Sequence, residues 1–227
     1  NNKLKSIGNC AFTDCDNLSE IVVPEGVEII GSNAFSYNYE LVDISLPSTL
    51  TSIGESAFYS CTSLESIEIP SSVTELSAFI FSFCSKLSNV KLNEGTSSIQ
   101  YAAFGGCTNL NTITIPNSIK SIDFWAFDYD MVIKGYAGSY AESFVETANS
   151  DHGFYHTFVD ITIPTGDINL DDAVNVKDAT LLQKYLVELE TLTPVQLAVA
   201  DVTQNGNVDI KDVSYILKAN AGFVELN

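Results

Sequence analysis

The sequence predicts a mixed fold, in which a β-rich solenoid of 23-residue coils precedes a small all-α module with two similar acidic loops. Two observations predict it. Apolar residues recur at a fixed step of 23 residues through the first two thirds of the chain, as in solenoid proteins. From Gly166 onward the step is lost and apolar residues follow helical spacing. We therefore place the solenoid and its cap at 1–162 and the helical module at 163–227.

The repeat consists of columns of residues that keep the 23-residue step. The most regular column holds phenylalanines, most of them preceded by alanine: Phe12, Phe35, Phe58, Phe81, Phe104 and Phe127. Leucine, isoleucine and proline columns keep the same step, beginning with Leu18, Ile21 and Pro24. This many matched columns in successive units indicates a solenoid.

Apolar and polar residues alternate around Ile21 and its equivalents, which predicts one short strand per coil in a parallel sheet. Pro24 and its equivalents end each strand where the chain turns. The alternate strand positions, opposite the core, are expected to form a recognition face: Glu20, Val22, Asp43, Ser45, Ser66, Glu68, Asn89, Lys91, Thr112 and Thr114. Because its N-terminal end is acidic, this face favours a partner with a basic patch.

Four cysteines fall in one column of the repeat: Cys15, Cys61, Cys84 and Cys107. Stacked coils point the side chains of a column the same way, so we expect a ladder of buried free thiols rather than disulfides. Cys10 lies outside the column. The cysteines therefore do not decide the compartment.

The repeat resembles the BspA-type leucine-rich repeats over roughly residues 3–160. Members of this family are common among secreted and surface proteins of bacteria and some protists. The segment VIKGYAGSYAESFVETAN, at 132–149, resembles the hairpin-plus-helix cap that often closes these solenoids. Such a cap covers the apolar core that an open solenoid end would expose.

The helical module contains two twelve-residue segments, at 167–178 and 201–212, which have the length of an EF-hand loop. Oxygen-bearing side chains occupy loop positions 1, 3, 5 and 12, and position 7 offers a backbone carbonyl. Hard oxygen donors at this alternation suit calcium, so one ion per loop, two in all, is predicted. The predicted ligands are Asp167, Asn169, Asp171, Ala173, Asp178, Asp201, Thr203, Asn205, Asn207 and Asp212.

Each loop is followed by an amphipathic segment whose apolar residues have helical spacing, at 177–189 and at 211–223. Between these segments, Thr193 as N-cap and Pro194 in the first turn predict the start of a third helix. This order, with aspartate at loop position 12, resembles the type I dockerin module from Gly166 to about Phe223. Dockerins bind cohesin modules on scaffoldin proteins and so build cellulosomes, the extracellular polysaccharide-degrading complexes of anaerobic bacteria. The resemblance implies a secreted, cellulosome-associated bacterial protein.

Dockerins commonly contact cohesin through loop positions 10 and 11 and the helix behind them. The corresponding residues are Val176, Lys177, Gln183, Lys184, Ile210, Lys211, Leu217 and Lys218. The segments 174–178 and 208–212 are near copies, so by resemblance one cohesin is expected to bind in either of two orientations. Asp172 replaces the usual glycine at loop position 6, and Thr203 is a poorer ligand than a carboxylate, so weakened calcium binding is expected.

Composition argues against several functions. A formal net charge of −19 without any arginine disfavours nucleic acids and anionic membrane surfaces, and no run is apolar enough for a transmembrane helix. Catalysis has little support, because the only histidines, His152 and His156, lie in the cap region without a nucleophile motif. We therefore expect a protein that is not an enzyme.

Three functions remain in competition. The favoured one is a non-catalytic interaction protein, whose dockerin binds a scaffoldin and whose repeats bind another protein or a surface. A second is carbohydrate or substrate adhesion, although Trp125 and the tyrosines favour packing or surface decoration over sugar stacking. A third is the regulatory part of an enzyme whose catalytic domain lies outside this chain. The chain begins at Asn1 within what looks like a repeat, so a processed or trimmed chain is expected.

Overall fold

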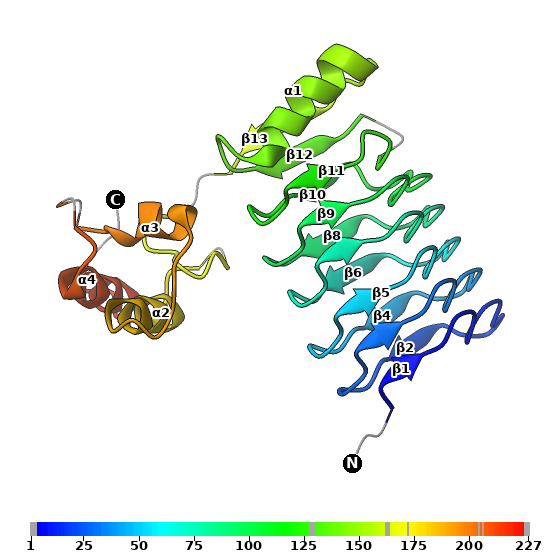
Figure 1. Cartoon of the computed structure of the whole chain (residues 1–227), viewed down its shortest axis with the longest axis horizontal. Helices are drawn as coiled ribbons and strands as arrows, with labels where there is room; N and C mark the ends of the chain where they lie inside the picture. The colour runs from blue at the N-terminus through cyan, green and yellow to red at the C-terminus, as the bar shows by residue number, and fades with distance from the viewer. Residues whose placement is uncertain are drawn as a thin grey trace. The chain divides into compact units, whose positions relative to one another are not determined.

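The structure is a computed structural model that describes residues 4–127, 130–161, 164–171, 173–203, 205 and 207–224. It separates into two compact units, Asn1–Ile161 and Thr162–Asn227 (Figure 1). The first unit is the solenoid with its cap, and the second holds the helical module.

Two sets of short parallel strands run along the solenoid (Figure 1). The first set follows the predicted strand column and comprises β2 (Glu20–Val22), β4 (Asp43–Ser45), β6 (Ser66–Ile69), β8 (Asn89–Leu92), β10 (Thr112–Thr114), β12 (Val132–Gly135) and β13 (Thr157–Asp160). The second set comprises β1 (Ser6–Ile7), β3 (Ile29–Ile30), β5 (Ser52–Ile53), β7 (Glu75–Leu76), β9 (Ser98–Ile99) and β11 (Ser121–Ile122).

The register of both sets keeps the 23-residue step: Glu20 pairs with Asp43 in the first set, and Ile7 pairs with Ile30 in the second. The prediction of one strand per coil is therefore wrong, because each coil has a second strand at another apolar column, which begins with Ile7, Ile30 and Ile53. Each strand of this second set has only two residues, one outward and one buried, except that Ser98 in β9 is half-buried. Two residues are too few for an alternation to be recognised in the sequence.

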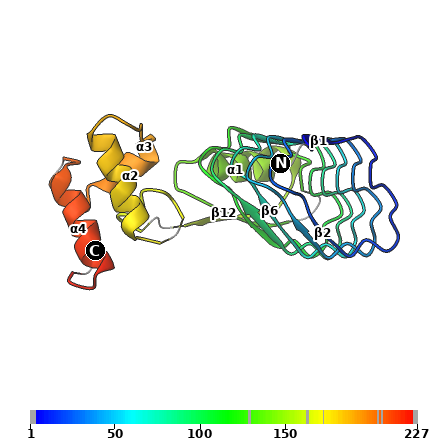
Figure 2. The same ribbon diagram turned by 90° about the horizontal axis from the view of Figure 1, so that it is seen from below.

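A ladder of phenylalanine rings forms the centre of the solenoid core. Successive rings from Phe12 to Phe127 are stacked, with centroids 5.3 to 5.6 Å apart and planes within 19° of parallel. Phe35 through Phe127 are buried, whereas Phe12 at the end of the ladder is 36% exposed. The 23-residue step thus places identical side chains in contact, and Figure 2 shows the coils lying one behind the other.

The predicted thiol ladder is confirmed for its three inner members. Cys61, Cys84 and Cys107 are buried, and each thiol donates a hydrogen bond of 3.1 Å to the carbonyl oxygen of a phenylalanine in the preceding coil. Burial raises the pKa of the Cys84 thiol well above its usual range. Cys15 is half-buried and Cys10 is exposed, and none of the five cysteines, all of which the structure describes, forms a disulfide.

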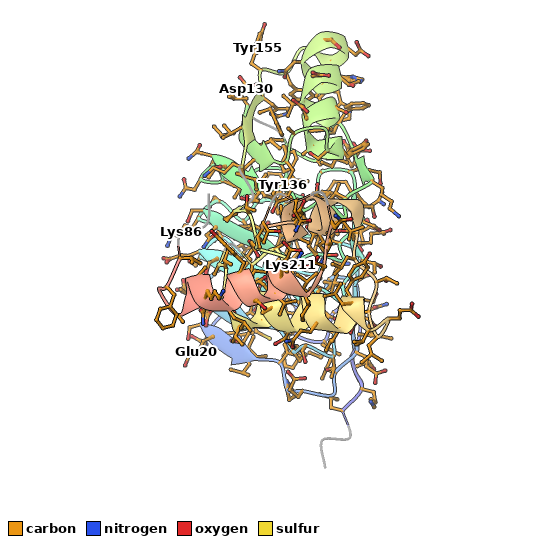
Figure 3. The ribbon with its side chains drawn as sticks, turned by 90° about the vertical axis from the view of Figure 1, so that its left-hand side faces the viewer. Glu20, Lys86, Asp130, Tyr136, Tyr155 and Lys211 are labelled. Atoms are coloured by element: carbon orange, nitrogen blue, oxygen red, sulfur yellow. The ribbon has the colours of Figure 1, made fainter. Side chains whose placement is uncertain are left out.

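The cap is a strand, a helix and a strand, formed by β12, α1 (Tyr140–His152) and β13. The expected hairpin is wrong, because β12 and β13 pair in parallel, with Ile133 opposite Phe158. A parallel pair needs a crossover, and α1 supplies it, burying Phe144 and Val145 on the core. At the same end Asp130 Oδ1 accepts a 2.9 Å bond from the Tyr155 backbone N–H, and both residues are labelled in Figure 3.

The described residues of the second unit form three helices, α2 (Val176–Leu186), α3 (Pro194–Ala200) and α4 (Ile210–Asn220). Helices α2 and α4 lie side by side (Figures 1 and 2). Their shared core comprises Ile168, Ala179, Leu182, Ala200, Val202, Val213 and Ile216. Thr193 is the N-cap of α3, as predicted, and accepts a 3.3 Å bond from the Gln196 backbone N–H. Both outer helices end three residues before the predicted segments do.

Candidate functional site

The first acidic loop is closed by Asp178, which lies in the first turn of α2. Its buried carboxylate accepts hydrogen bonds through Oδ1 from the backbone N–H groups of Ile168 and Asn169, at 2.8 and 2.9 Å. Its Oδ2 accepts a 2.8 Å bond from the N–H of Asn175, the N-cap of α2. The aspartate at loop position 12 thereby links the start of the loop to the N-cap residue at position 9.

The second loop repeats this arrangement. The carboxylate of Asp212, buried in the first turn of α4, accepts bonds from the Thr203 backbone N–H and hydroxyl at 3.0 and 2.9 Å. Its other oxygen accepts a 2.8 Å bond from the N–H of Asp209. The two loop and helix units are therefore near copies in structure as well as in sequence.

Within each loop the backbone N–H of position 5 donates hydrogen bonds back to side chains at the start of the loop. The Asp171 N–H donates to Asp167 Oδ1 at 3.1 Å and to Asn169 Oδ1 at 3.0 Å. In the second loop the Asn205 N–H donates to Asp201 Oδ1 at 3.1 Å. In the first loop the side-chain oxygens of positions 1 and 3 thus accept bonds from the same backbone N–H, and in the second loop the oxygen of position 1 accepts the equivalent bond.

The predicted ligands differ in exposure. Asp167, Asp178 and Asp212 are buried; Asn169, Asp201 and Thr203 are half-buried; Asp171, Ala173, Asn205 and Asn207 are exposed. Within the described ranges no group of three or more carboxylate, thiol or imidazole side chains is close enough to hold a metal, so a cation here would depend on amide, hydroxyl and carbonyl oxygens as well. That mixed set of hard oxygens fits calcium chemistry. Asp172, at loop position 6, lies outside the described residues.

One predicted ligand has a cationic partner. Lys177 Nζ lies 3.1 Å from Asp171 Oδ2, and both side chains are exposed. In the second loop the corresponding lysine, Lys211, lies 3.8 Å from Asp209 instead (Lys211 is labelled in Figure 3). The lysines of the two loops therefore have ion-pair partners at different loop positions, position 5 in the first loop and position 9 in the second.

All eight predicted cohesin-contacting residues are exposed. They include two apolar side chains at the helix starts, Val176 at 55% and Ile210 at 61% exposure. Leu217 on α4 is also exposed, whereas its neighbour Ile216 is buried in the core. An apolar residue followed by a lysine is thus presented to solvent at the start of both α2 and α4.

Sequence reasoning missed the N-cap residues at loop position 9. The side chains of Asn175 and Asp209 accept bonds from the backbone N–H groups of Lys177 and Lys211, at 2.9 and 2.6 Å. With Asp178 and Asp212 three residues later, they complete capping boxes. The sequence pattern that could have identified them is a short polar residue with an aspartate three residues later.

The expected recognition face of the solenoid is exposed at all ten positions. Between β4 and β6 it contains a hollow of about 470 Å³ that is lined by Asp43, Ser66 and Glu68, among other residues. Glu68 accepts 3.0 Å bonds from Asn93 and Lys91, and these contacts lower the pKa of its carboxyl.

Comparison with known families accounts for both units. The model of the BspA type leucine rich repeat region matches residues 5–134 in six copies. The chain belongs to the BspA-type leucine-rich repeat family. The model of the dockerin type I domain matches residues 165–219, so these repeats are followed by a type I dockerin. Dockerins of this type bind calcium and cohesins, and neither kind of module is catalytic.

Solved structures similar to this BspA-type chain are also leucine-rich repeat proteins. A leucine rich cell surface protein from Faecalibacterium prausnitzii is 30% identical over 48% of this chain, with a TM-score of 0.44. The T. pallidum leucine rich repeat protein is 24% identical over 59% of this chain and 68% of its own, with a TM-score of 0.39. This chain spans 32% of the F. prausnitzii protein. No curated protein matches it.

None of the helices in the described ranges combines the length and the apolar character needed to cross a bilayer.

Proposed function

We propose that this protein is a non-catalytic component of a cellulosome-type assembly. Its dockerin holds two calcium ions and binds the cohesin module of a scaffoldin, while its repeats recognise another protein or a surface ligand. The observation that carries this proposal is the duplicated loop and helix unit, which exposes Val176-Lys177 and Ile210-Lys211 in matching positions. Secretion and an extracellular, bacterial setting follow from the same proposal.

The calcium ligands in this proposal are the ten loop residues predicted from the sequence. Asp167 and Asp178 bury two carboxylates in one loop of a small unit, and ionised carboxylates are costly to bury without a compensating charge. A bound dication would offset that cost and would link the loop to α2. Folding of the second unit would then depend on calcium.

The expected role of the repeats rests on the strand face. Glu20 and Asp43 are paired in register on β2 and β4, and both are exposed. Like charges directly opposite one another are destabilising, so a basic partner placed over them would relieve repulsion. The face therefore fits a protein with a basic patch.

Isothermal titration of the full chain against a panel of purified type I cohesin modules tests the docking function. Binding to at least one module in calcium, and its loss in EDTA, is the expected result. The double variant Asp178→Ala, Asp212→Ala should lose binding in calcium, whereas Asp151→Asn, which changes an exposed carboxylate on α1, should not. Binding that persists in EDTA would contradict the calcium role, and failure with every cohesin would contradict the docking role.

A further inference from the structure

Four aromatic rings, three of them exposed, form a continuous row in the turns between the two sets of strands. In this aromatic row, Tyr39, Tyr37, Tyr59 and Phe83 follow one another with centroid separations of 6.3, 5.4 and 5.4 Å. Tyr39 is 46%, Tyr37 41% and Phe83 52% exposed, and Tyr59 is half-buried. Adjacent rings meet edge to face at 61° to 69°, unlike the parallel rings of the buried phenylalanine ladder.

The fold does not require aromatic residues at two of these positions. Tyr37 and Phe83 belong to a column whose members have positive φ wherever the structure describes them, namely Asp14, Tyr37, Ser60, Phe83 and Gly106, at 57°, 61°, 58°, 64° and 72°. This conformation directs the backbone N–H of the column to the next coil, as in the 2.8 Å bond from Tyr37 to the carbonyl of Tyr59. Asp, Ser and Gly make the same turn in other coils.

Bulky side chains are disfavoured at positive φ, whereas Gly and Asn tolerate it. Tyr37 and Phe83 therefore occupy strained positions while leaving much of their rings in water. Strain of this kind, kept where the fold does not need it, points to a function of the side chain. A Cβ built at Gly106 would come within 2.7 Å of the Phe83 ring, so the next coil leaves room for that ring.

The surroundings of the aromatic row are polar and carry hydroxyl groups. The column of Tyr39 continues with Thr62, Ser85 and Thr108 in the following coils, and each of these hydroxyls bonds a carbonyl of the preceding coil at 3.4 to 3.5 Å. Their lone pairs remain able to accept further bonds. The row therefore combines apolar ring surface with a regular line of hydroxyls.

Tyr37, Tyr59 and Phe83 advance by about one coil per ring, and Tyr39 lies beside Tyr37 in the same coil. A ligand that contacts every ring must itself be extended and regular. A folded protein instead is usually held by clustered anchors in well-packed pockets. Sugar rings have apolar C–H faces that lie against aromatic rings, and hydroxyl rims that hydrogen-bond to side chains such as Thr62 and Ser85. The net charge of −19 repels anionic polymers.

We propose that the aromatic row binds a neutral linear polysaccharide, whose sugar rings stack on Tyr39, Tyr37, Tyr59 and Phe83. This site lies in the turns, apart from the strand face, and its function goes beyond docking. The protein would then bring an assembly and a glycan together without catalysis.

Affinity electrophoresis of the full chain tests this proposal, in gels that contain xylan, glucomannan or the anionic polymer polygalacturonate, together with depletion by insoluble cellulose. Retention by at least one neutral polymer but not by polygalacturonate is expected. Phe83→Asn and Tyr37→Asn should each weaken binding by about tenfold, and the double variant should weaken it further. Asparagine suits positive φ, so the melting temperature of these variants should stay the same or rise.

Tyr155→Ala is the matched control, because Tyr155 is an aromatic residue of the same unit, 78% exposed, outside the row (Figure 3). It should leave glycan retention unchanged. All these variants should keep any cohesin binding of the parent chain, which separates this proposal from the docking proposal. The proposal would be overturned if no neutral polymer retained the chain, or if the double variant were retained as strongly as the parent. Binding of the aromatic row to a protein, without retention by any polymer, would also overturn it.

Discussion

The phenylalanine ladder shows that the burial of a side chain depends on its place in the column. Phe81 is fully buried and lies between Phe58 and Phe104, with centroids 5.4 and 5.6 Å away. Phe12 has the same column position but only one stacked neighbour, Phe35, and is 36% exposed. The same residue type thus occurs in two environments within one chain.

Phe81→Ala should lower the free energy of unfolding of the solenoid by about 3–5 kcal/mol, because it leaves a cavity that the stacked coils cannot close. Phe12→Ala, at the exposed end of the ladder, should cost less than half as much. Urea unfolding of the full chain, followed by the β-sheet circular-dichroism signal, measures both. Equal costs would show that the ladder does not determine stability.

His156 is buried in the cap. Its Nδ1 accepts a 3.1 Å bond from the Met131 N–H, so the neutral ring carries its proton on Nε2, which is buried without a described hydrogen-bond partner. Burial among Phe127, Phe144 and Phe154 lowers the pKa of His156, and the charge of Asp130 opposes this only in part.

Because the folded cap disfavours protonated His156, the unfolded chain takes up the proton first on acidification. Stability of the cap should therefore be complete above the unfolded histidine pKa of about 6.5 and should fall as the pH decreases below it, by up to about 1.4 kcal/mol per pH unit. Urea midpoints between pH 7.5 and 5.5 measure this. His152→Gln, which removes the exposed histidine of α1, should retain the dependence, and His156→Gln should abolish it. A flat profile for the parent chain would contradict the assignment.

At the scale of elements, α2 and α4 begin with the same capping box, the same buried aspartate and the same exposed apolar-lysine pair. Two equivalent surfaces allow one partner to bind in two orientations. The equivalence is incomplete: Gln183 on α2 corresponds to Leu217 on α4, and Lys177 pairs with Asp171 whereas Lys211 pairs with Asp209. If a cohesin binds in both orientations, these differences should make their populations unequal.

Dual binding predicts a particular pattern among three variants measured against a cohesin that binds the parent chain in calcium. Changing Val176 and Lys177 to Asp and Glu should alter the affinity only slightly, and so should the same change at Ile210 and Lys211. The combined variant should lose about 1–3 kcal/mol or more, because no intact surface remains. Loss of binding in one of the two single-surface variants would instead establish a single binding mode.

At the scale of the whole molecule, the two units are stabilised by different means. The solenoid has a continuous apolar core from Ile7 to Ala148, whereas the second unit has a small core and buries Asp167, Asp178 and Asp212. A small domain with few buried apolar residues usually requires an additional source of stability. Bound calcium is the source that its loops would supply.

Removal of calcium should therefore unfold one unit and leave the other intact. In EDTA the helical circular-dichroism signal of α2, α3 and α4 should fall, while the β signal of the solenoid should persist. Excess calcium should restore the helical signal, and magnesium at the same concentration should restore less of it, because magnesium demands a stricter octahedral geometry. An unchanged helical signal in EDTA would contradict calcium-dependent folding.

The sequence alone was sufficient for the features that repeat with a fixed step. The 23-residue step predicted the thiol ladder, the parallel sheet and the exposure of the strand face, and the stacked phenylalanines and the pairing of Glu20 with Asp43 keep the same step. It did so because side chains at the same position of successive coils must meet when coils stack in parallel. Local chemistry also sufficed for the N-cap Thr193, and loop spacing selected the aspartates that the structure buries at the starts of α2 and α4.

Only the tertiary structure decided the features that depend on backbone conformation or on contacts between different columns. The strands of the second set have two residues each, too few for an alternation of apolar and polar residues to be recognised in the sequence. The parallel pairing of β12 with β13 depends on where α1 packs. Tyr59 is separated from Tyr37 by 22 residues and from Phe83 by 24 rather than 23, so no single column contains all three. Their rings meet because side chains of neighbouring columns lean across adjacent coils, a contact that the three-dimensional arrangement alone specifies.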